Sequence, residues 1–170
     1  MPPIPTLATI GGVEFAPLFA GQIAEAGPNL IESRMNESAT PIDFGIAVVR
    51  GVAVAAGLVG NCRPQAADAD LIVGITVRNS GPMVALNDGT NTVLYRQYQA
   101  VPVMKIGSIG VIPFENVVEG DGVIAIVAQG GKLGGTTAGA AGAGRIAVPG
   151  AKWVSTTLAG AIGKVRIVTA

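Results

Sequence analysis

The side chains that could carry out catalysis are few in this sequence. The chain contains no histidine and a single cysteine, Cys62. Without histidine, the Ser-His-Asp and Cys-His arrangements are impossible, and so are metal sites that use histidine. Two pairs of acids, Asp68 with Asp70 and Glu119 with Asp121, could bind calcium, but neither pair lies in an oxygen-rich calcium-binding loop. We therefore expect solvated acids in turns, no enzymatic activity, and no metal or cofactor.

One glycine pattern has the form of a nucleotide-binding loop. Residues 142–147 read GAGRIA, which formally satisfies G-x-G-x-x-G/A. A dinucleotide site needs a strand before this loop, a helix after it, and an acidic residue about 20 residues downstream. Here a low-complexity stretch precedes the loop, the β-like run RIAV follows it, and no acidic residue occurs after Asp121. We interpret the match as accidental.

The composition describes a glycine-rich protein with little charge. Of its 170 residues, 49% are hydrophobic, 4% are aromatic and 13% are charged, whereas about a quarter are charged in typical soluble domains. So few charges suit a protein whose surface is largely covered by neighbouring molecules. The net charge of zero does not suggest a nucleic-acid partner. No apolar run reaches the ~18 residues of a membrane helix, so we expect no membrane association.

The charges are distributed unevenly along the chain. Eleven acidic and six basic residues precede position 122, and five basic residues but no acidic residue follow it. In an assembly, such halves can form complementary patches that fix the orientation of neighbours. The basic candidates for partner binding are Lys152, Lys164 and Arg166. The last two alternate with apolar residues and should share one outward face of a strand.

Residues 1–41 differ from the rest of the chain. They contain six of the eleven prolines, which excludes a long helix or a central strand. We predict an extended proline-rich N-terminal arm over 1–41, followed by a β domain over 42–170. An apolar arm needs a surface to lie on, and the sequence leaves open whether that surface is its own domain or a neighbour. The candidate partner-binding residues of the arm are Phe15, Leu18, Phe19, Ile23, Leu30 and Ile31.

After Pro41, short runs rich in valine and isoleucine alternate with turn signals at about ten-residue spacing. This pattern predicts an all-β protein, either a compact β-barrel or a β-sandwich of about eight short strands. The predicted strands cover 43–50, 70–78, 95–105, 108–113, 122–128, 144–148, 152–158 and 164–169.

Turn and loop signals lie between these runs. Asn87-Asp88-Gly89 predicts a hairpin turn. Pro102 indicates that its run is at a sheet edge or at the entry to a strand. The glycine- and alanine-rich stretch 134–144 is predicted to be a mobile loop at the end of a strand.

The order of the strand-like segments resembles a known family. Along the chain these segments read PIDFGIAVVRG, DLIVGITVRN, QAVPVMKIGSIGVIPFENVVEGDGV, GKLG and GRIAVPGAKWVSTTLAGAIGKVRIV. In order and spacing they are similar to the structural cement proteins of tailed bacteriophages, which decorate and reinforce the capsid. The resemblance covers about residues 41–170 and leaves the arm outside.

The resemblance implies an architecture and a role but no active site. It implies a compact β-barrel or sandwich that binds the major capsid protein on the outer surface of the virion, after synthesis in the host cytoplasm. It further implies that the protein stabilises the shell by bridging capsomers, as a homo-oligomer, with a trimer expected before a dimer. Residues 118–122 would form a turn with glycines at positive φ, and Trp153 would close the end of the barrel.

Two other classes of protein remain as alternatives. A small-ligand or carbohydrate-binding β-barrel module would usually expose several aromatic residues, but this chain has one tryptophan and two tyrosines. A different virion part, such as a tail-tube or major capsid subunit, is the other alternative. The small size and the lack of a long helix argue against a capsid subunit.

Overall fold

The computed structural model describes residues 9–10, 13–14, 18–25, 27–52, 60–78 and 94–168. The strands are β1 (Thr9–Ile10), β2 (Val13–Glu14), β3 (Leu30–Asn36), β4 (Ala47–Arg50), β5 (Asn61–Pro64), β6 (Ile72–Thr76), β7 (Ala100–Val111), β8 (Gly122–Ile126), β9 (Lys132–Gly135), β10 (Arg145–Trp153) and β11 (Gly163–Ile167). In these segments the one helix is a 3₁₀ turn, Val127–Gln129. None of the described segments forms a helix long and apolar enough to cross a membrane.

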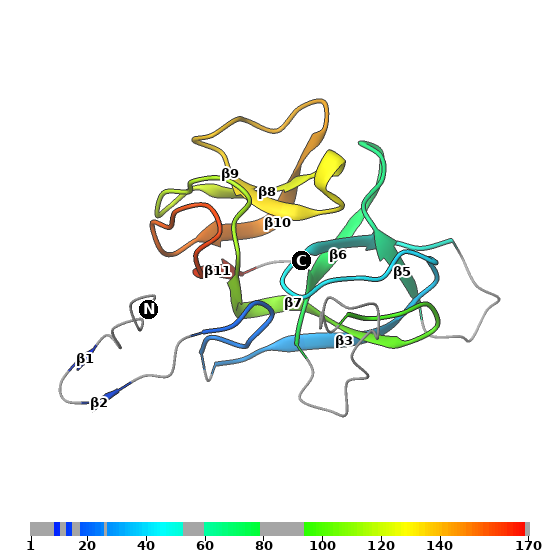
Figure 1. Ribbon diagram of the computed structural model, residues 1–170, viewed down its shortest axis with the longest axis horizontal. Helices are drawn as coiled ribbons and strands as arrows, with labels where there is room; N and C mark the ends of the chain where they lie inside the picture. Colours follow the sequence, from blue (N-terminus) through cyan, green and yellow to red (C-terminus); the bar gives the residue numbers. More distant parts are fainter. Residues whose placement is uncertain are drawn as a thin grey trace, which may run out of the picture.

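Five of these strands close into a barrel (Figure 1). Their order is β3-β5-β4-β6-β7, and β3 closes the ring by pairing with β7. Neighbouring strands are antiparallel except β3 and β5, which run parallel. Closure removes free sheet edges, which would otherwise invite pairing with other chains. The predicted all-β fold with a barrel is therefore confirmed.

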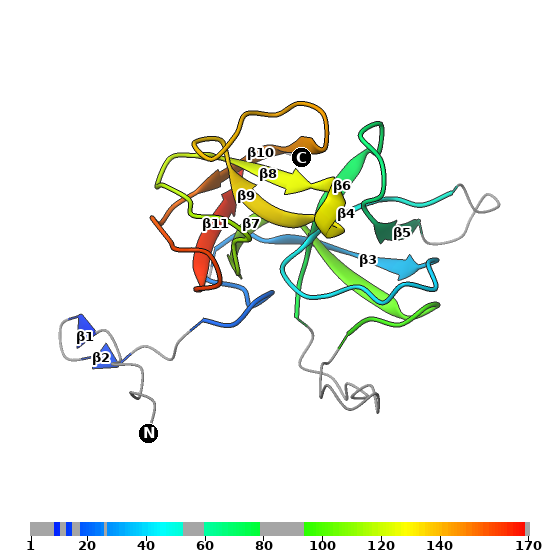
Figure 2. The ribbon, with the colours of Figure 1, turned by 45° about the horizontal axis from the view of Figure 1, so that its top comes forward.

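The long strand β7 joins the barrel to a second sheet. Its first half pairs with β3 and β6, and residues 107–111 pair with β11. From β11 the sheet continues through β10 and β8 to β9. A bridge between Pro113 and Leu133 brings the chain after β7 alongside β9. Figure 2 shows β8, β9 and β10 lying beside the barrel strands.

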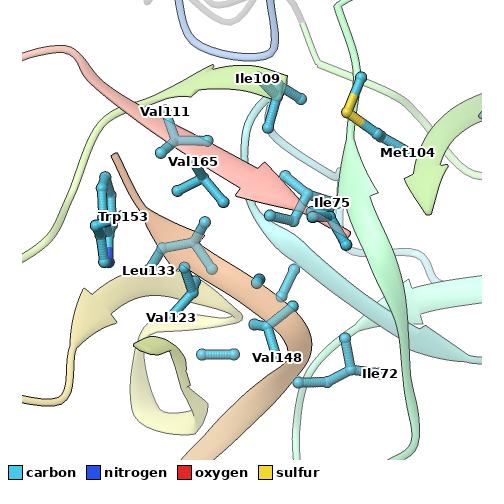
Figure 3. Close-up of a cluster of buried hydrophobic side chains, with 14 of the residues drawn as sticks. Ile72, Ile75, Met104, Ile109, Val111, Val123, Leu133, Val148, Trp153 and Val165 are labelled. Carbon is cyan, nitrogen blue, oxygen red and sulfur yellow. The ribbon is translucent and has the colours of Figure 1, made fainter. Parts of the chain in front are cut away.

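Two apolar cores result from this arrangement. The smaller core comes from barrel strands and the segments that join them, and comprises Ile42, Ile46, Val48, Cys62, Tyr95, Val101 and Val103. The larger core, part of which Figure 3 shows, joins barrel strands to the second sheet. On β4, Val48 belongs to the smaller core, whereas Ala47 and Val49 belong to the larger. Because both faces of such strands are buried, their sequences are continuous apolar runs.

Trp153 belongs to the larger core. Its side chain is 1% exposed, and its indole N–H donates a hydrogen bond to the carbonyl of Gly134 at 2.9 Å. Figure 3 shows the ring at the edge of the cluster. Since Trp153 lies on β10, which is not a barrel strand, the prediction that it closes the end of the barrel is wrong. The burial of this indole stabilises the second sheet instead.

Pro102 lies inside β7, where the sequence predicted an edge or the entry to a strand. Its carbonyl accepts a hydrogen bond from the backbone N–H of Val77 at 2.8 Å, so its missing N–H would also have faced Val77. The carbonyl of Val77 instead accepts a hydrogen bond from the hydroxyl of Tyr95 at 2.5 Å. The tyrosine thus satisfies the acceptor that proline leaves unpaired, which allows proline within a paired strand.

Other differences from the prediction concern strand limits. Strands β3, β5 and β9 were not predicted, because LIESRMN, NCRP and KLGG contain charges, proline or glycine in place of apolar runs. The predicted strand 144–148 and the first two residues of the predicted strand 152–158 belong to one strand, β10, which has an irregular register in its middle. The rest of the predicted strand, 154–158, lies in the loop after β10 and is not a strand. The predicted hairpin at 87–89 lies outside the described residues. Because β3 lies within the predicted arm, the barrel begins before residue 42; an arm before Leu18 stays a prediction.

Candidate interaction surface

The segment Leu18–Glu25 lies along the second half of β7. The carbonyl of Gly110 accepts a hydrogen bond from the N–H of Gly21, and the N–H of Gly110 donates to the carbonyl of Gln22, each at 2.8 Å. This pattern is an antiparallel pairing, so the segment adds an edge to the sheet opposite β11. This part of the predicted arm therefore packs on its own domain.

Large apolar side chains of this segment nevertheless remain at the surface. Phe19 is 53% exposed and Ile23 is 40% exposed. The guanidinium of Arg78 lies over the ring of Phe19, 5.3 Å from its centroid. Together with Gln22 these side chains line an open pocket of about 320 Å³. The backbone pairing fixes the segment, so its apolar side chains are held in place before any partner binds.

The other residues of the arm that were predicted to bind a partner lie close to this segment in sequence. Leu30 and Ile31, at the start of β3, are 46% and 36% exposed. Leu18 is half-buried. Phe15 lies outside the described residues. Arg78 was not singled out from the sequence, because an arginine at the end of a strand gives no sign that it will meet an arm phenylalanine.

An ion pair fastens the segment to the second sheet. The Nζ of Lys164 lies 2.6 Å from Oε1 of Glu25, and the hydroxyl of Ser108 donates to Oε2 of Glu25 at 2.9 Å. The hydrogen bond from Lys164, followed by that from Ser108, lowers the pKa of Glu25 below its usual value. The charge of Lys164 is thus compensated within the chain.

The other two basic candidates face each other on neighbouring strands. Lys152 of β10 is paired in register with Arg166 of β11. Lys152 and Arg166 are exposed. On β11, Lys164 is half-buried and Arg166 is exposed, while Val165 and Ile167 are buried, which confirms the predicted outward face of this strand. Neither Lys152 nor Arg166 forms an ion pair with any residue in the described ranges. Like charges directly opposite each other repel, so an acidic group from a partner would bind favourably here.

Asp70 is held by bonds within the chain. Its carboxylate pairs with Arg63, the shortest contact being 2.5 Å, and accepts hydrogen bonds from the backbone N–H groups of Ala66 and Ala67 at 2.9 Å. Burial opposes ionisation, but these bonds outweigh it and lower the pKa of Asp70. Asp70 is therefore a structural residue of a turn and not a free ligand.

Asp121 has a similar role beside the second sheet. Its buried carboxylate accepts hydrogen bonds from the hydroxyls of Thr137 and Thr136 at 2.6 and 3.2 Å, and from the N–H of Val118 at 3.0 Å. Burial again opposes ionisation, but the bonds from these donors lower the pKa of Asp121. In the same turn Gly120 has a positive φ of 91°, as predicted, whereas Gly122 begins β8.

The glycine- and alanine-rich loop is fastened at several points. Arg145 pairs with Glu115 and also donates to the carbonyl of Gly139 at 3.1 Å. The carboxylate of Asp68 accepts a hydrogen bond from the N–H of Gly144 at 2.8 Å. The run RIAV of the formal nucleotide motif begins strand β10, as the sequence indicated.

The described residues contain no group of three or more Cys, Asp or Glu side chains that could hold a metal ion. Cys62 is fully buried, and burial raises the pKa of its thiol to about 11. A thiol with this pKa is a poor nucleophile at neutral pH. Exposed apolar and basic side chains of the described residues are thus available for binding, whereas Asp70 and Asp121 serve the fold.

Comparison with known proteins agrees with this description. Residues 8–168 match the family described as "Structural cement protein (E217 gp24/Pam3 gp6)". No curated protein matches the chain. A solved chain from "The capsid of Myoviridae Phage XM1" is similar in fold, with a TM-score of 0.66, 21% sequence identity, and coverage of 95% of each chain. Because the family match spans nearly the whole chain, including residues 8–40 that the sequence resemblance left out, this chain belongs to the phage structural cement protein family, whose members have a structural role in the capsid.

Proposed function

We propose that this protein decorates the outer surface of the capsid of a tailed phage and stabilises the shell by bridging capsomers of the major capsid protein. Family membership supports a structural, non-enzymatic role in the virion. The observation that carries the finer proposal is the exposed apolar surface of the segment Leu18–Glu25, fixed on β7 and followed in sequence by the exposed start of β3.

The proposed mechanism is thermodynamic. A protein that binds the assembled shell, but not the dissociated subunits, stabilises the assembly by mass action. Many copies on a symmetric lattice make modest individual contacts collectively large. In this scheme Phe19, Ile23, Leu30 and Ile31 bury apolar area against a capsomer, while the Lys152–Arg166 pair meets acidic side chains. Phe15 and Leu18 would extend the apolar contact.

The carbohydrate-binding alternative has little support. Trp153 and Tyr95 are 1% and 4% exposed, so neither can stack on a sugar. Of the one tryptophan and two tyrosines of the chain, Tyr98 is exposed. A flat platform for a sugar usually needs more than one such ring.

Co-sedimentation with expanded phage shells, compared with dissociated capsid subunits, tests the proposal. We expect the protein to bind shells only and to raise the temperature at which they dissociate. The variant Phe19→Ser/Ile23→Ser should bind shells at least ~10-fold more weakly, because two apolar anchors are lost. Leu71→Ser is the matched control, because Leu71 is 62% exposed and lies in another part of the chain. This variant should bind shells as tightly as the parent protein. Equal binding to shells and dissociated subunits would contradict the mechanism.

A further inference from the structure

A second group of exposed apolar side chains lies at one end of the second sheet. These side chains come from the loop between β7 and β8 and from the loop between β10 and β11. Their exposed fractions range from 38% to 69%. We call this group the end patch; its members are Ile112, Phe114, Val118, Leu158 and Ile162. Neighbouring apolar residues exposed in this way commonly mark a protein-binding surface.

Backbone hydrogen bonds hold the two loops of the end patch together. Val117 and Thr157 exchange bonds of 2.9 and 3.0 Å, and the N–H of Gly160 donates to the carbonyl of Pro113 at 3.0 Å. Figures 1 and 2 both show the loops side by side at the same end of the sheet. The patch is therefore formed in the free protein, and its binding would require little ordering of the chain.

Opposite charges border the end patch at its two ends. The Nζ of Lys132 lies 5.9 Å from the centroid of the Phe114 ring, and Glu119 directly follows Val118. Lys132 is the first residue of β9, and Gly135, the last residue of this strand, lies beside the Asp121 turn. At the usual rise per residue of a strand, the two ends of β9 are about 10 Å apart. Neither Lys132 nor Glu119 forms an ion pair with a residue of the described part of the chain.

We propose that the end patch of one copy binds the end patch of a second copy about a two-fold axis. In a two-fold interface the same surface of both copies is in contact, so a group at one end of the patch in one copy contacts the group at the opposite end of the patch in the other copy. This arrangement buries apolar surface against apolar surface and places Glu119 of each copy against Lys132 of the other. The Lys152–Arg166 pair could not meet itself in this way, because like charges would repel. The inference goes beyond the proposed function, in which many copies bind the shell, by naming a surface through which two copies would associate; it selects the dimer over the trimer that the sequence resemblance placed first.

Light scattering or sedimentation of the free full-length protein, over a series of concentrations at low salt, tests the proposed dimer. We expect the parent protein to be a dimer. Leu158→Glu should raise its dissociation constant at least ~10-fold, because a carboxylate would be buried against apolar surface. Leu71→Glu is the matched control: it places the same charge at a residue 62% exposed, outside the end patch, and should leave the dimer intact.

A charge exchange tests the two-fold pairing itself. Glu119→Lys and Lys132→Glu should each weaken the dimer up to ~10-fold, and the double variant should return to within ~2-fold of the parent. Circular dichroism checks that each variant is folded, and Ile162→Glu replaces Leu158→Glu if that variant is not. A parent protein that stays monomeric or forms trimers, a patch variant that dimerises normally, or a double variant as weak as the single ones overturns the proposal. Because shells are absent, failure here is distinguishable from failure of shell binding.

Discussion

Replacing Asp121 with alanine removes an acceptor that joins the turn before β8 to the residues after β9. The carboxylate accepts three hydrogen bonds, from Thr137, Thr136 and Val118. A hydrogen bond to a charged group contributes about 1.5–3 kcal/mol to stability. All three donor residues are exposed, so their polar groups regain water in the variant and the contributions do not add fully. We therefore expect Asp121→Ala to lower the free energy of unfolding by about 2–4 kcal/mol at pH 7.

The pH dependence gives this prediction a sign that a simple packing defect would not have. The pKa of Asp121 in the folded protein lies below its ordinary value of 3.8. Because the pKa is lower in the folded than in the unfolded protein, the ionised carboxylate stabilises the folded state at pH values above the pKa of the unfolded protein. This contribution disappears as the pH falls through the pKa of the folded protein. The difference in unfolding free energy between parent and variant should thus be largest at neutral pH and shrink below about pH 4.

Urea unfolding followed by the fluorescence of Trp153 measures both quantities, because Trp153 is the single tryptophan and is buried. Thr137→Ala, which deletes one donor, should lower the free energy of unfolding by about 1 kcal/mol. The same substitution should have no effect on stability when Asp121 has already been replaced by alanine. The reasoning is refuted if Asp121→Ala unfolds at the same urea concentration as the parent at pH 7. It is also refuted if the difference grows as the pH falls.

Three further predictions follow from other contacts. Gly131→Ala should lower the free energy of unfolding, measured in urea, by about 2–4 kcal/mol, because the φ of Gly131 is +90° and a Cβ there would lie 2.2 Å from the carbonyl oxygen of Ala47. Unchanged stability would show that the barrel and the second sheet can move apart locally. Cys62 should stay unreactive toward a thiol reagent at pH 8 until the protein is unfolded, because its pKa is about 11 and it is buried; rapid labelling of the native protein would contradict this. Lys164→Met should make the segment Leu18–Glu25 cleave faster in limited proteolysis without unfolding the barrel, as Glu25 loses its ion pair, and an unchanged cleavage rate would assign the fastening to the backbone bonds alone.

Local sequence pattern predicted the strands whose both faces are buried. Strand β6 and the first half of β7 appear as valine- and isoleucine-rich runs because one face enters the smaller core and the other enters the larger. In the second half of β7, Ile109 and Val111 enter the larger core. Strand β3 escaped prediction because its sequence is mostly polar and its place depends on pairing with β5 and β7. The strand propensity of a residue reflects how well its side chain packs on a half-buried sheet surface. A strand that is held mainly by pairing with its neighbours therefore has little strand-like pattern in its own sequence.

The candidate surface was predictable in part. The apolar content of the arm indicated Phe19, Ile23, Leu30 and Ile31, which the structure leaves exposed. The end patch was not predicted, since its members belong to two loops whose proximity depends on the bonds between Val117 and Thr157. Contacts between residues so far apart in sequence follow from topology, which no local pattern encodes.

The charges of the second sheet show why the free protein and the bound protein should differ. Lys164 is neutralised by Glu25, but Lys152 and Arg166 remain opposite each other without an acidic partner in the described structure. Their repulsion costs the isolated fold a few tenths of a kcal/mol up to about 1 kcal/mol. In the proposed function, a carboxylate of the capsid removes that cost on binding. Salt screens such contacts, so added salt should weaken shell binding of the parent more than that of Lys152→Gln/Arg166→Gln. Equal salt dependence of the two proteins would mean that this pair lies outside the interface, and the apolar segment Leu18–Glu25 would then have to account for the binding.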